Sequence, residues 1–305
     1  MSVDQQVRDG FDHGMDVGQE QQPTDTEQVD PSEHLLPTPD KYNDPSQIPV
    51  SHSIPELRSI TQGERVEQFE TWLEGKEKSA QGAPRHSFSR ANAKYWCARI
   101  QDVDRLVQWR YQNPHTIMIT GGGGCFEDSR STPILDYHDK IHSTHSTVRR
   151  ALRRVLGDRD YASIKLYTPS KERNYGQTHW HEGIWVDGKI DESDLKPVIG
   201  SYVRNCDVAK PEYHSVTDAV SVEPLIHNNL REYEGDKGKG PTSAMAGYLV
   251  NNLVSMNKEG VDVRSSDFAE LLWSAQLSAE NRNKVYTSGQ FDCMADEMNE
   301  KRRNQ

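Results

Sequence analysis

Between residues 61 and 112, apolar side chains recur at the three- and four-residue spacing of amphipathic helices. The first repeat runs through GERVEQFETWLEG (63–75), and the second runs through SRANAKYWCARIQDVDRLVQWRYQ (89–112). Asn113-Pro114 follows directly, and proline cannot continue a helix because it lacks the backbone N–H. The pattern therefore predicts two helices that end before residue 113.

From residue 114 on, short apolar and β-branched runs alternate with further helical patterns. HTIMIT (115–120) reads as a buried strand that ends on four glycines, and YASIKLYTP (161–169) and THWHEGIWVDG (178–188) read as paired strands. We expect helices over 134–156, 194–209 and 243–256, and a strand over 214–225. Strands and helices alternate imperfectly, with hairpin character in the middle, which favours an α+β fold over a doubly wound sheet.

Composition changes this picture mainly at the start of the chain. Only 33% of the 305 residues are hydrophobic and the mean hydropathy is −0.87, which is lean for a chain that buries all of itself. Residues 1–50 carry eleven acidic residues against Arg8 and Lys41, so most of the net charge of −11 lies there. We expect a disordered acidic tail to about residue 60. A solvated tail is the simplest interpretation, and a DNA mimic or partner arm is the alternative.

Several protein classes are excluded by what the sequence lacks. No apolar run approaches the roughly 18 residues of a membrane span, and the first thirty residues have no apolar signal core, so we expect a cytoplasmic protein with no membrane partner. The cysteines are far apart and form no CxxC pair, which excludes a disulfide framework and a zinc knuckle. They are Cys97, Cys125, Cys206 and Cys293.

The glycine-rich stretches do not form a nucleotide-binding loop. Gly121 to Gly124 lead into Cys125 and Phe126 without a Lys-Ser/Thr pair, and the stretch from Gly235 has Pro241 where a hydroxyl is needed. No G-x-S-x-G elbow of a serine hydrolase occurs either. We therefore expect neither a built-in ATPase nor a nucleotide cofactor.

The most specific chemical motif is the sequence His179-Trp180-His181. Side chains two apart on a strand share a face, so both imidazoles point one way and Trp180 points into the opposite, packed layer. Two imidazoles on one face form half of a divalent-metal site. The alternative is a pair of polar residues on a wet sheet face, but the apolar run 184–186 just downstream favours a partly central strand.

A second candidate is Tyr248, in the predicted helix 243–256. Its neighbours Ala244, Ala246 and Gly247 are small, so this helix can approach a sheet closely and direct the phenol at it. The alternative interpretation is a core tyrosine with a hydrogen-bonded hydroxyl.

The densest positive charge of the chain lies near residue 150. Four arginines at positions i, i+1, i+4 and i+5 form one stripe on the predicted helix 134–156, and a phosphate backbone is a natural partner for it. A solvated helix face is the alternative. The four residues are Arg149, Arg150, Arg153 and Arg154.

In chain order, the strand that ends at Thr120, the His179–His181 pair and Tyr248 resemble the three motifs of the HUH endonucleases. This superfamily contains rolling-circle replication initiators, relaxases and single-strand transposases. The likeness is closest to replication initiators of haloarchaeal plasmids and small viruses, and it spans roughly residues 85–292. Also similar are the helix-Asn-Pro-strand opening, the Val-Asp-Gly end of the HxH strand, and the YVRNC, Ala-Gly-Tyr-Leu and AELLW segments.

The resemblance implies a fold and a division of the chain. A central antiparallel sheet would carry the HxH strand, with helices on one face and the tyrosine helix crossing the metal. The segments would be an acidic tail over 1–60, a helical segment over 61–112, an endonuclease core over 113–260 and a helical segment over 261–305.

The resemblance also implies a chemistry. His179 and His181 would hold Mg²⁺ or Mn²⁺, and Tyr248 would attack single-stranded origin DNA to give a 5′-phosphotyrosyl link and a 3′-hydroxyl primer. A host helicase and a host DNA polymerase would be partners. The strand Ile164–Pro169 supplies no acidic third ligand before the pair, and Asn251 and Asn252 follow the tyrosine where the family often has lysine.

Three other tyrosines compete with Tyr248 for the role of nucleophile: Tyr167, Tyr175 and Tyr202. Two other functions also stay open. A transposase or relaxase would use the same residues on different DNA, and a non-catalytic DNA-binding protein could retain an altered HUH scaffold.

Overall fold

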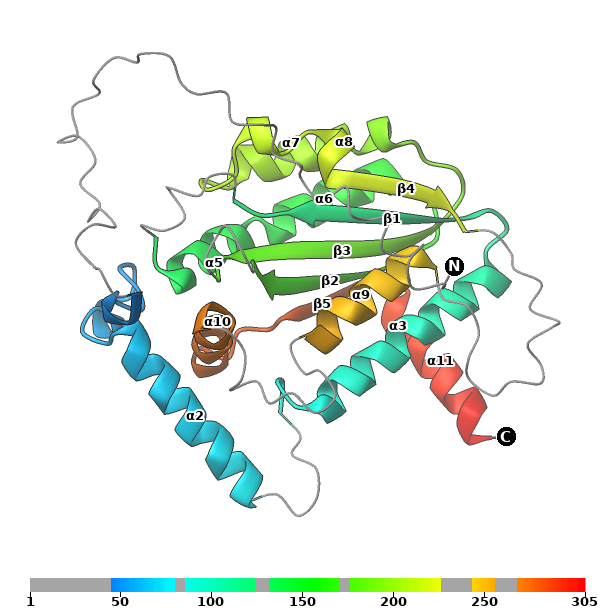
Figure 1. Ribbon diagram of the computed structural model, residues 1–305. Helices are drawn as coiled ribbons and strands as arrows, with labels where there is room; N and C mark the ends of the chain where they lie inside the picture. Colours follow the sequence, from blue (N-terminus) through cyan, green and yellow to red (C-terminus); the bar gives the residue numbers. More distant parts are fainter. Residues whose placement is uncertain are drawn as a thin grey trace, which may run out of the picture.

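A five-stranded sheet in the order β4-β1-β3-β2-β5 organises the described part of the chain (Figure 1). The computed structural model describes residues 45–79, 86–123, 132–170, 176–225, 243–255 and 268–304. Every neighbouring pair of strands is antiparallel, and β3 is central, which confirms the α+β class with a central antiparallel sheet that carries the HxH strand. The strands are β1 (Pro114–Gly121), β2 (Tyr161–Pro169), β3 (Thr178–Asp187), β4 (Val220–Pro224) and β5 (Val285–Gly289).

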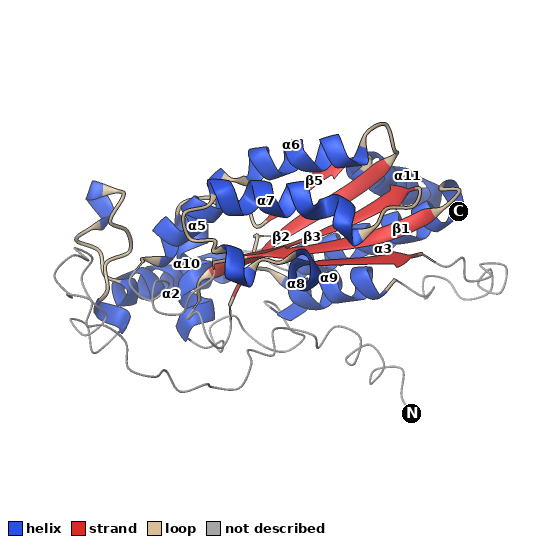
Figure 2. Cartoon of the chain, turned by 90° about the horizontal axis from the view of Figure 1, so that it is seen from above, coloured by secondary structure: helices blue, strands red, loops and turns tan. Residues whose placement is uncertain are grey.

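Helices cover both faces of the sheet, so the prediction of helices on one face was wrong (Figure 2). The physical reason is that β3 carries a large apolar side chain on each face: Trp180 on one and Trp185 on the other are both buried. On the Trp180 side lie α5 (Ile134–Ser143), α6 (His145–Leu156) and α7 (Lys196–Asn205). On the Trp185 side lie α3 (Arg90–Arg110), α9 (Ala244–Ser255) and α11 (Phe291–Arg303).

The remaining elements pack around this sandwich. Helices α2 (Gln62–Ser79) and α10 (Phe268–Ala279) contact each other beyond one end of the sheet (Figure 1). The short elements are η3 (Pro45–Gln47), η4 (Pro55–Leu57), η5 (Glu192–Leu195), η6 (Pro211–Tyr213) and α8 (Val216–Ala219). Cys97, Cys206 and Cys293 are free thiols, and Cys125 lies outside the described residues.

Folded chain begins earlier than the expected tail boundary near residue 60. Val50 is buried, and the Ser51 hydroxyl donates a 2.5 Å hydrogen bond to the Asp136 carboxylate on α5. Residues 1–44, which hold most of the expected acidic tail, lie outside the described residues.

Two predicted elements are divided in the structure. The helix expected over 134–156 breaks at Thr144, whose hydroxyl donates to the Ile141 carbonyl at 2.7 Å, so that it becomes α5 and α6. The strand expected over 214–225 starts with a helical turn because the Ser215 hydroxyl caps it by accepting the Asp218 N–H. Only residues 220–224 then pair as β4.

Alternation along β3 gives two separate cores, one on each face of the sheet. Trp180 is 1% exposed, and its ring lies 5.3 Å from that of Tyr202 on α7, as its predicted position in the packed layer requires. On the other face, the ring of Trp185 packs against Phe291 of α11. His179 and His181 share this second face, beneath α9.

Candidate active site

The two histidines of β3 lie side by side and each meets a threonine on a neighbouring strand. His179 is opposite Thr168 of β2, and its Nε2 lies 2.9 Å from the threonine hydroxyl. His181 is opposite Thr120 of β1, and its Nδ1 lies 3.0 Å from that hydroxyl. The ring centroids are 4.8 Å apart and the rings are almost perpendicular. The hydroxyls therefore fix the orientation of both imidazoles, as outer partners of ligand histidines commonly do.

Tyr248 on α9 completes the cluster. Its hydroxyl oxygen lies 3.3 Å from Nε2 of His181, and the two ring centroids are 5.0 Å apart. The structure thus brings together the three residues that the sequence analysis singled out as nucleophile and metal ligands, although they are up to 69 positions apart in the sequence.

A glycine in β3 lets the tyrosine helix approach the sheet. A Cβ atom on Gly183 would lie 2.5 Å from Cδ1 of Leu249 and 3.1 Å from the sulfur of Met245, both on α9. Small residues on the helix were expected to permit this approach, and the structure shows that a glycine on the strand permits it too. Gly183 lies two positions after His181 on the same face of β3. It therefore sets the distance between α9 and the sheet next to the point where Tyr248 meets the histidines.

A buried carboxylate on α3 holds the start of the tyrosine helix. Asp104 accepts hydrogen bonds from the Ser243 hydroxyl at 2.6 Å, the Ser243 N–H at 2.8 Å and the Trp185 indole N–H at 2.6 Å. Burial raises the pKa of Asp104, and these hydrogen bonds oppose the rise. One side chain therefore ties α3, β3 and α9 together behind the site.

The glycine run at the end of β1 provides space for packing. A Cβ on Gly121 would fall within 2.8 Å of three atoms of the Trp180 ring, and one on Gly123 would overlap the Tyr137 hydroxyl. The Gly122 carbonyl accepts the Tyr202 hydroxyl at 2.8 Å. The glycines therefore leave room for large aromatic rings beside the HxH strand. Sequence reasoning missed this role because a run of glycines does not show which distant residues pack against it.

Burial controls the protonation of the site. It lowers the pKa of His181 well below the usual value for histidine, and the neighbouring His179 lowers it further. His181 is therefore neutral at physiological pH, which is the form that binds a metal or accepts a proton. Burial raises the pKa of the Tyr248 phenol, so ionisation at attack needs a nearby proton acceptor or positive charge.

The residues present fit a divalent cation in part. Two imidazoles on one face can supply two nitrogen ligands, and Nε2 of His181 lies on the side of the Tyr248 oxygen. Among the described residues, no group of three His, Cys, Asp or Glu side chains is placed to hold a metal. Water and substrate oxygens would have to complete the shell. An imidazole pair without a carboxylate suits Mn²⁺ better than Mg²⁺, which strongly prefers oxygen ligands.

The rival tyrosines do not share this face, as far as the structure describes them. Tyr167 follows Leu166 on β2 and packs against His142 and Tyr286, and Tyr202 packs on Trp180. Both therefore lie on the opposite side of the sheet from His181. Tyr175 lies outside the described residues.

The arginine stripe also lies away from the site. It sits on α6, which covers the Trp180 face of the sheet, whereas Tyr248 lies over the other face (Figure 2). Arg150, Arg153 and Arg154 are exposed and Arg149 is half-buried. Within the described segments, none of the four forms an ion pair with a carboxylate.

Comparison with known proteins assigns the chain to a family. Residues 50–256 match the family described as "Putative rep protein (DUF1424)", and the chain belongs to this family. An "Uncharacterized 36 kDa protein" of Halobacterium salinarum is 25% identical over 207 residues, which cover 63% of this chain and 64% of the relative.

A second "Uncharacterized 36 kDa protein", from Halobacterium sp. (strain GN101), is 26% identical over 175 residues, covering 52% of this chain and 53% of the relative. The chain thus spans less than two thirds of the length of either relative. No solved structure matches it. Across the described residues, no helix has the length and apolar character needed to cross a membrane.

The role of Gly183 can be tested with a matched pair of glycine substitutions. Gly183→Ala should lower the free energy of unfolding by about 1–3 kcal/mol because its methyl group displaces Leu249 and lifts α9. Gly75→Ala on α2, where a Cβ meets nothing within 4 Å, should be neutral or stabilising by up to about 1 kcal/mol. Urea unfolding of both variants measures the difference, and equal stabilities would show that α9 does not rest on Gly183.

Proposed function

We propose that this protein is a replication initiator that nicks and rejoins single-stranded origin DNA through Tyr248. The observation that carries the proposal is the 3.3 Å approach of the Tyr248 hydroxyl to Nε2 of His181. A phenol beside two oriented imidazoles is suited to attack on a phosphodiester. Membership of a family described as rep proteins supports the same class of function.

In the proposed reaction, the Tyr248 oxygen attacks the scissile phosphorus and the bond from phosphorus to the 3′ oxygen breaks. The products are a 5′-phosphotyrosyl link and a free 3′-hydroxyl. The phenol gives up its proton to water at attack, and the leaving 3′ oxygen takes up a proton. Nε2 of His181 is the nitrogen left to hold a cation beside the phenol, because Nδ1 is paired with Thr120. A helix that rests on Gly183 and is anchored by Asp104 holds the phenol at one angle, which in-line attack requires.

Thr120 and Thr168 orient the imidazoles that would hold Mn²⁺ or Mg²⁺. Such an ion, when bound, supplies positive charge against the negative charge that builds on the phosphate oxygens in the transition state. Phosphate oxygens of the DNA strand would have to supply further ligands, because among the described residues only the two histidines are placed to do so.

The proposed link retains the energy of the phosphodiester bond, so rejoining needs no ATP. The 3′-hydroxyl can prime a host DNA polymerase, and unwinding is left to a host helicase. This division of labour agrees with a sequence that has no phosphate-binding loop.

A non-catalytic DNA-binding protein is the second candidate, and the incomplete ligand set among the described residues favours it. A transposase or relaxase would keep the same chemistry and differ in its DNA target. Formation of a covalent adduct excludes the first alternative, and the structure of the cleaved DNA separates the others from an initiator.

The nucleophile can be identified by removing a single oxygen atom. Tyr248→Phe keeps the ring, so the variant should fold and bind single-stranded DNA as before but form no covalent adduct and release no 3′-hydroxyl. Tyr202→Phe, on the opposite face, should retain adduct formation. Labelled origin strand with Mn²⁺, followed by mass spectrometry of the trapped peptide, gives the readout. A nucleotide on the peptide that contains Tyr175 would refute the assignment.

The metal ligands can be tested by titration as well as by activity. His179→Ala and His181→Ala should each weaken Mn²⁺ binding and abolish nicking, whereas His52→Ala, outside the site, should change neither. Because burial lowers the pKa of His181, the wild-type protein should still bind Mn²⁺ near pH 6, where an ordinary histidine is largely protonated. Calorimetric titration measures binding, and full nicking by the double variant would contradict the assignment.

The arginine stripe should contribute to binding without contributing to sequence choice. Replacement of Arg149, Arg150, Arg153 and Arg154 by glutamine should weaken binding to all DNA sequences. It should also flatten the salt dependence by roughly 0.7 per lost contact on single strands, or about 0.9 on duplex. Arg303→Gln at the exposed end of α11 is the control. An unaltered slope in the fourfold variant would show that the stripe is a solvated helix face that does not contact DNA.

A further inference from the structure

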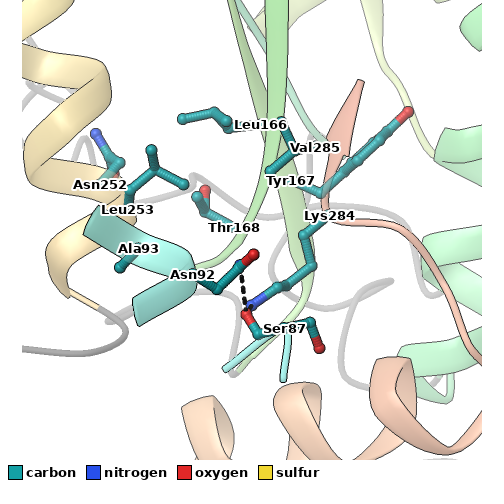
Figure 3. A pocket seen from close by; sticks show the side chains of 10 residues that line it. All are labelled: Ser87, Asn92, Ala93, Leu166, Tyr167, Thr168, Asn252, Leu253, Lys284 and Val285. Atoms are coloured by element: carbon teal, nitrogen blue, oxygen red, sulfur yellow. Dashed lines mark hydrogen bonds between the residues drawn. The ribbon is translucent and has the colours of Figure 1, made fainter. Parts of the chain in front are cut away.

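A small cavity with both apolar and polar walls lies beside the candidate active site, between α3, α9, β2 and the start of β5 (Figure 3). Its volume of about 20 Å³ has room for about one water molecule or one oxygen atom of a larger group, and it excludes a nucleobase or a sugar. The polar side chains that line it are those of Ser87, Asn92, Thr168, Asn252 and Lys284. They are one cation, two amides and two hydroxyls, without a carboxylate, so the polar part of the lining suits an anionic oxygen, while the rest of the wall is apolar.

Lys284 is the cation of this cavity and has no acidic partner among the described residues. Its Nζ donates to the Ser87 carbonyl at 2.8 Å and lies 3.7 Å from the centroid of the Phe88 ring. Figure 3 shows the amine directed from the start of β5 toward Ser87 and Asn92. Burial lowers the pKa of Lys284 to about 7, which means that its charge is poorly compensated by its surroundings.

The start of α3 adds a second source of positive potential. Ser89 caps this 21-residue helix by accepting the Asn92 N–H at 3.2 Å, and no acidic residue occupies the first turn. Asn92 and Ala93 of the cavity wall lie in the first turns of this helix, and Ser87 lies two residues before its N-cap. The partial positive charge of a helix N-terminus therefore acts at the same place as the lysine.

Two residues connect the cavity to the proposed active site. Thr168 lines the cavity, and its hydroxyl also holds Nε2 of His179 at 2.9 Å. Asn252 lines it from α9, one turn after Tyr248, and its side-chain amide donates to the Tyr248 carbonyl at 3.0 Å. Lys284 therefore shares a cavity with residues that contact both His179 and Tyr248.

We propose that this cavity is a phosphate subsite, in which Lys284 and the start of α3 bind a phosphodiester of the same single strand next to the one that Tyr248 attacks. The inference rests on the proposed function for the identity of the strand, and it adds Lys284 as a residue that positions DNA. The ligand is a backbone phosphate, so the subsite is independent of base sequence.

The test uses the full chain and an oligothymidylate of about ten nucleotides, in EDTA so that no cleavage occurs. Lys284→Met should weaken binding about 5- to 10-fold and reduce the slope of log K against log salt by about 0.7. Lys284→Arg should retain the affinity because it keeps a cation in place. Lys189→Met, in the exposed ion pair with Asp191 that follows the far end of β3, removes the same charge from a residue that does not line the cavity and should change neither quantity.

The pH dependence of DNA affinity separates a charge contact from a structural role, because a purely structural role of Lys284 would not make affinity follow its protonation. Wild-type affinity should fall as the pH rises from about 6.5 to 9, since Lys284 loses its proton in that range, whereas the arginine variant should stay level. The other titratable groups near Lys284 are His86 and Tyr167. Burial lowers the pKa of His86, and burial raises the pKa of Tyr167 above this range, so both keep their charge state across the series.

Three results would overturn the subsite. One is unchanged affinity and salt slope in Lys284→Met, with thermal unfolding showing that the variant is folded. The second is an equal loss of affinity in the methionine and arginine variants. The third is a gain in melting temperature from inorganic phosphate that needs Lys284 while oligonucleotide binding does not, which would mark a site for free anions.

Covalent adduct formation on origin DNA is measured separately, so the two proposals can fail independently. An adduct without any effect of Lys284 on binding would overturn the subsite and leave the nuclease proposal intact. A Lys284-dependent affinity without an adduct would leave a single-strand subsite in a protein that does not nick.

Discussion

The two-residue alternation of β3 is the constraint on which the rest of the structure depends. His179, His181 and Gly183 face α9, while Trp180 and Glu182 face the helices on the other side. A shift of one residue in the register would exchange the two sets and place the imidazoles in an apolar core. β3 is protected from such a shift because it is paired along nearly its whole length with β1 on one side and β2 on the other.

The register alone would leave the tyrosine helix free to move, and buried polar contacts remove that freedom. Asp104 binds α9 at its start and Trp185 at the middle of the sheet, so the helix and the strand share one acceptor. Loss of such an acceptor leaves buried donors unsatisfied, which costs more than the bond itself contributes. The position of Tyr248 is therefore fixed by residues that take no part in the proposed chemistry.

Local pattern was sufficient to predict the strands 115–120, 161–169 and 178–188 and the side of β3 on which each histidine lies, because both depend on periods of two or three to four residues. It was insufficient for the supporting residues. Asp104 and Ser243 are 139 positions apart, and Lys284 reaches a cavity whose other walls come from three distant elements. Such contacts exist only after the chain has folded. The packing of helices on both faces of the sheet was missed, because the pattern along a strand does not show which helix packs on which of its faces.

The net charge of −11 is distributed unevenly along the chain, which leaves basic groups available for the proposed contacts with DNA. Most of the acidity lies in residues 1–50, and at physiological ionic strength a surface charge acts over only about 8 Å. The electrostatic potential of the exposed arginines of α6 therefore acts only near α6, and that of Lys284 acts only on the other face of the sheet. Each phosphate contact adds a similar amount to the salt slope on single strands, so four arginine contacts should lose more affinity than one Lys284 contact as ionic strength rises. At high salt a larger share of the remaining affinity should therefore come from the contact beside Tyr248, where the chemistry is proposed to occur.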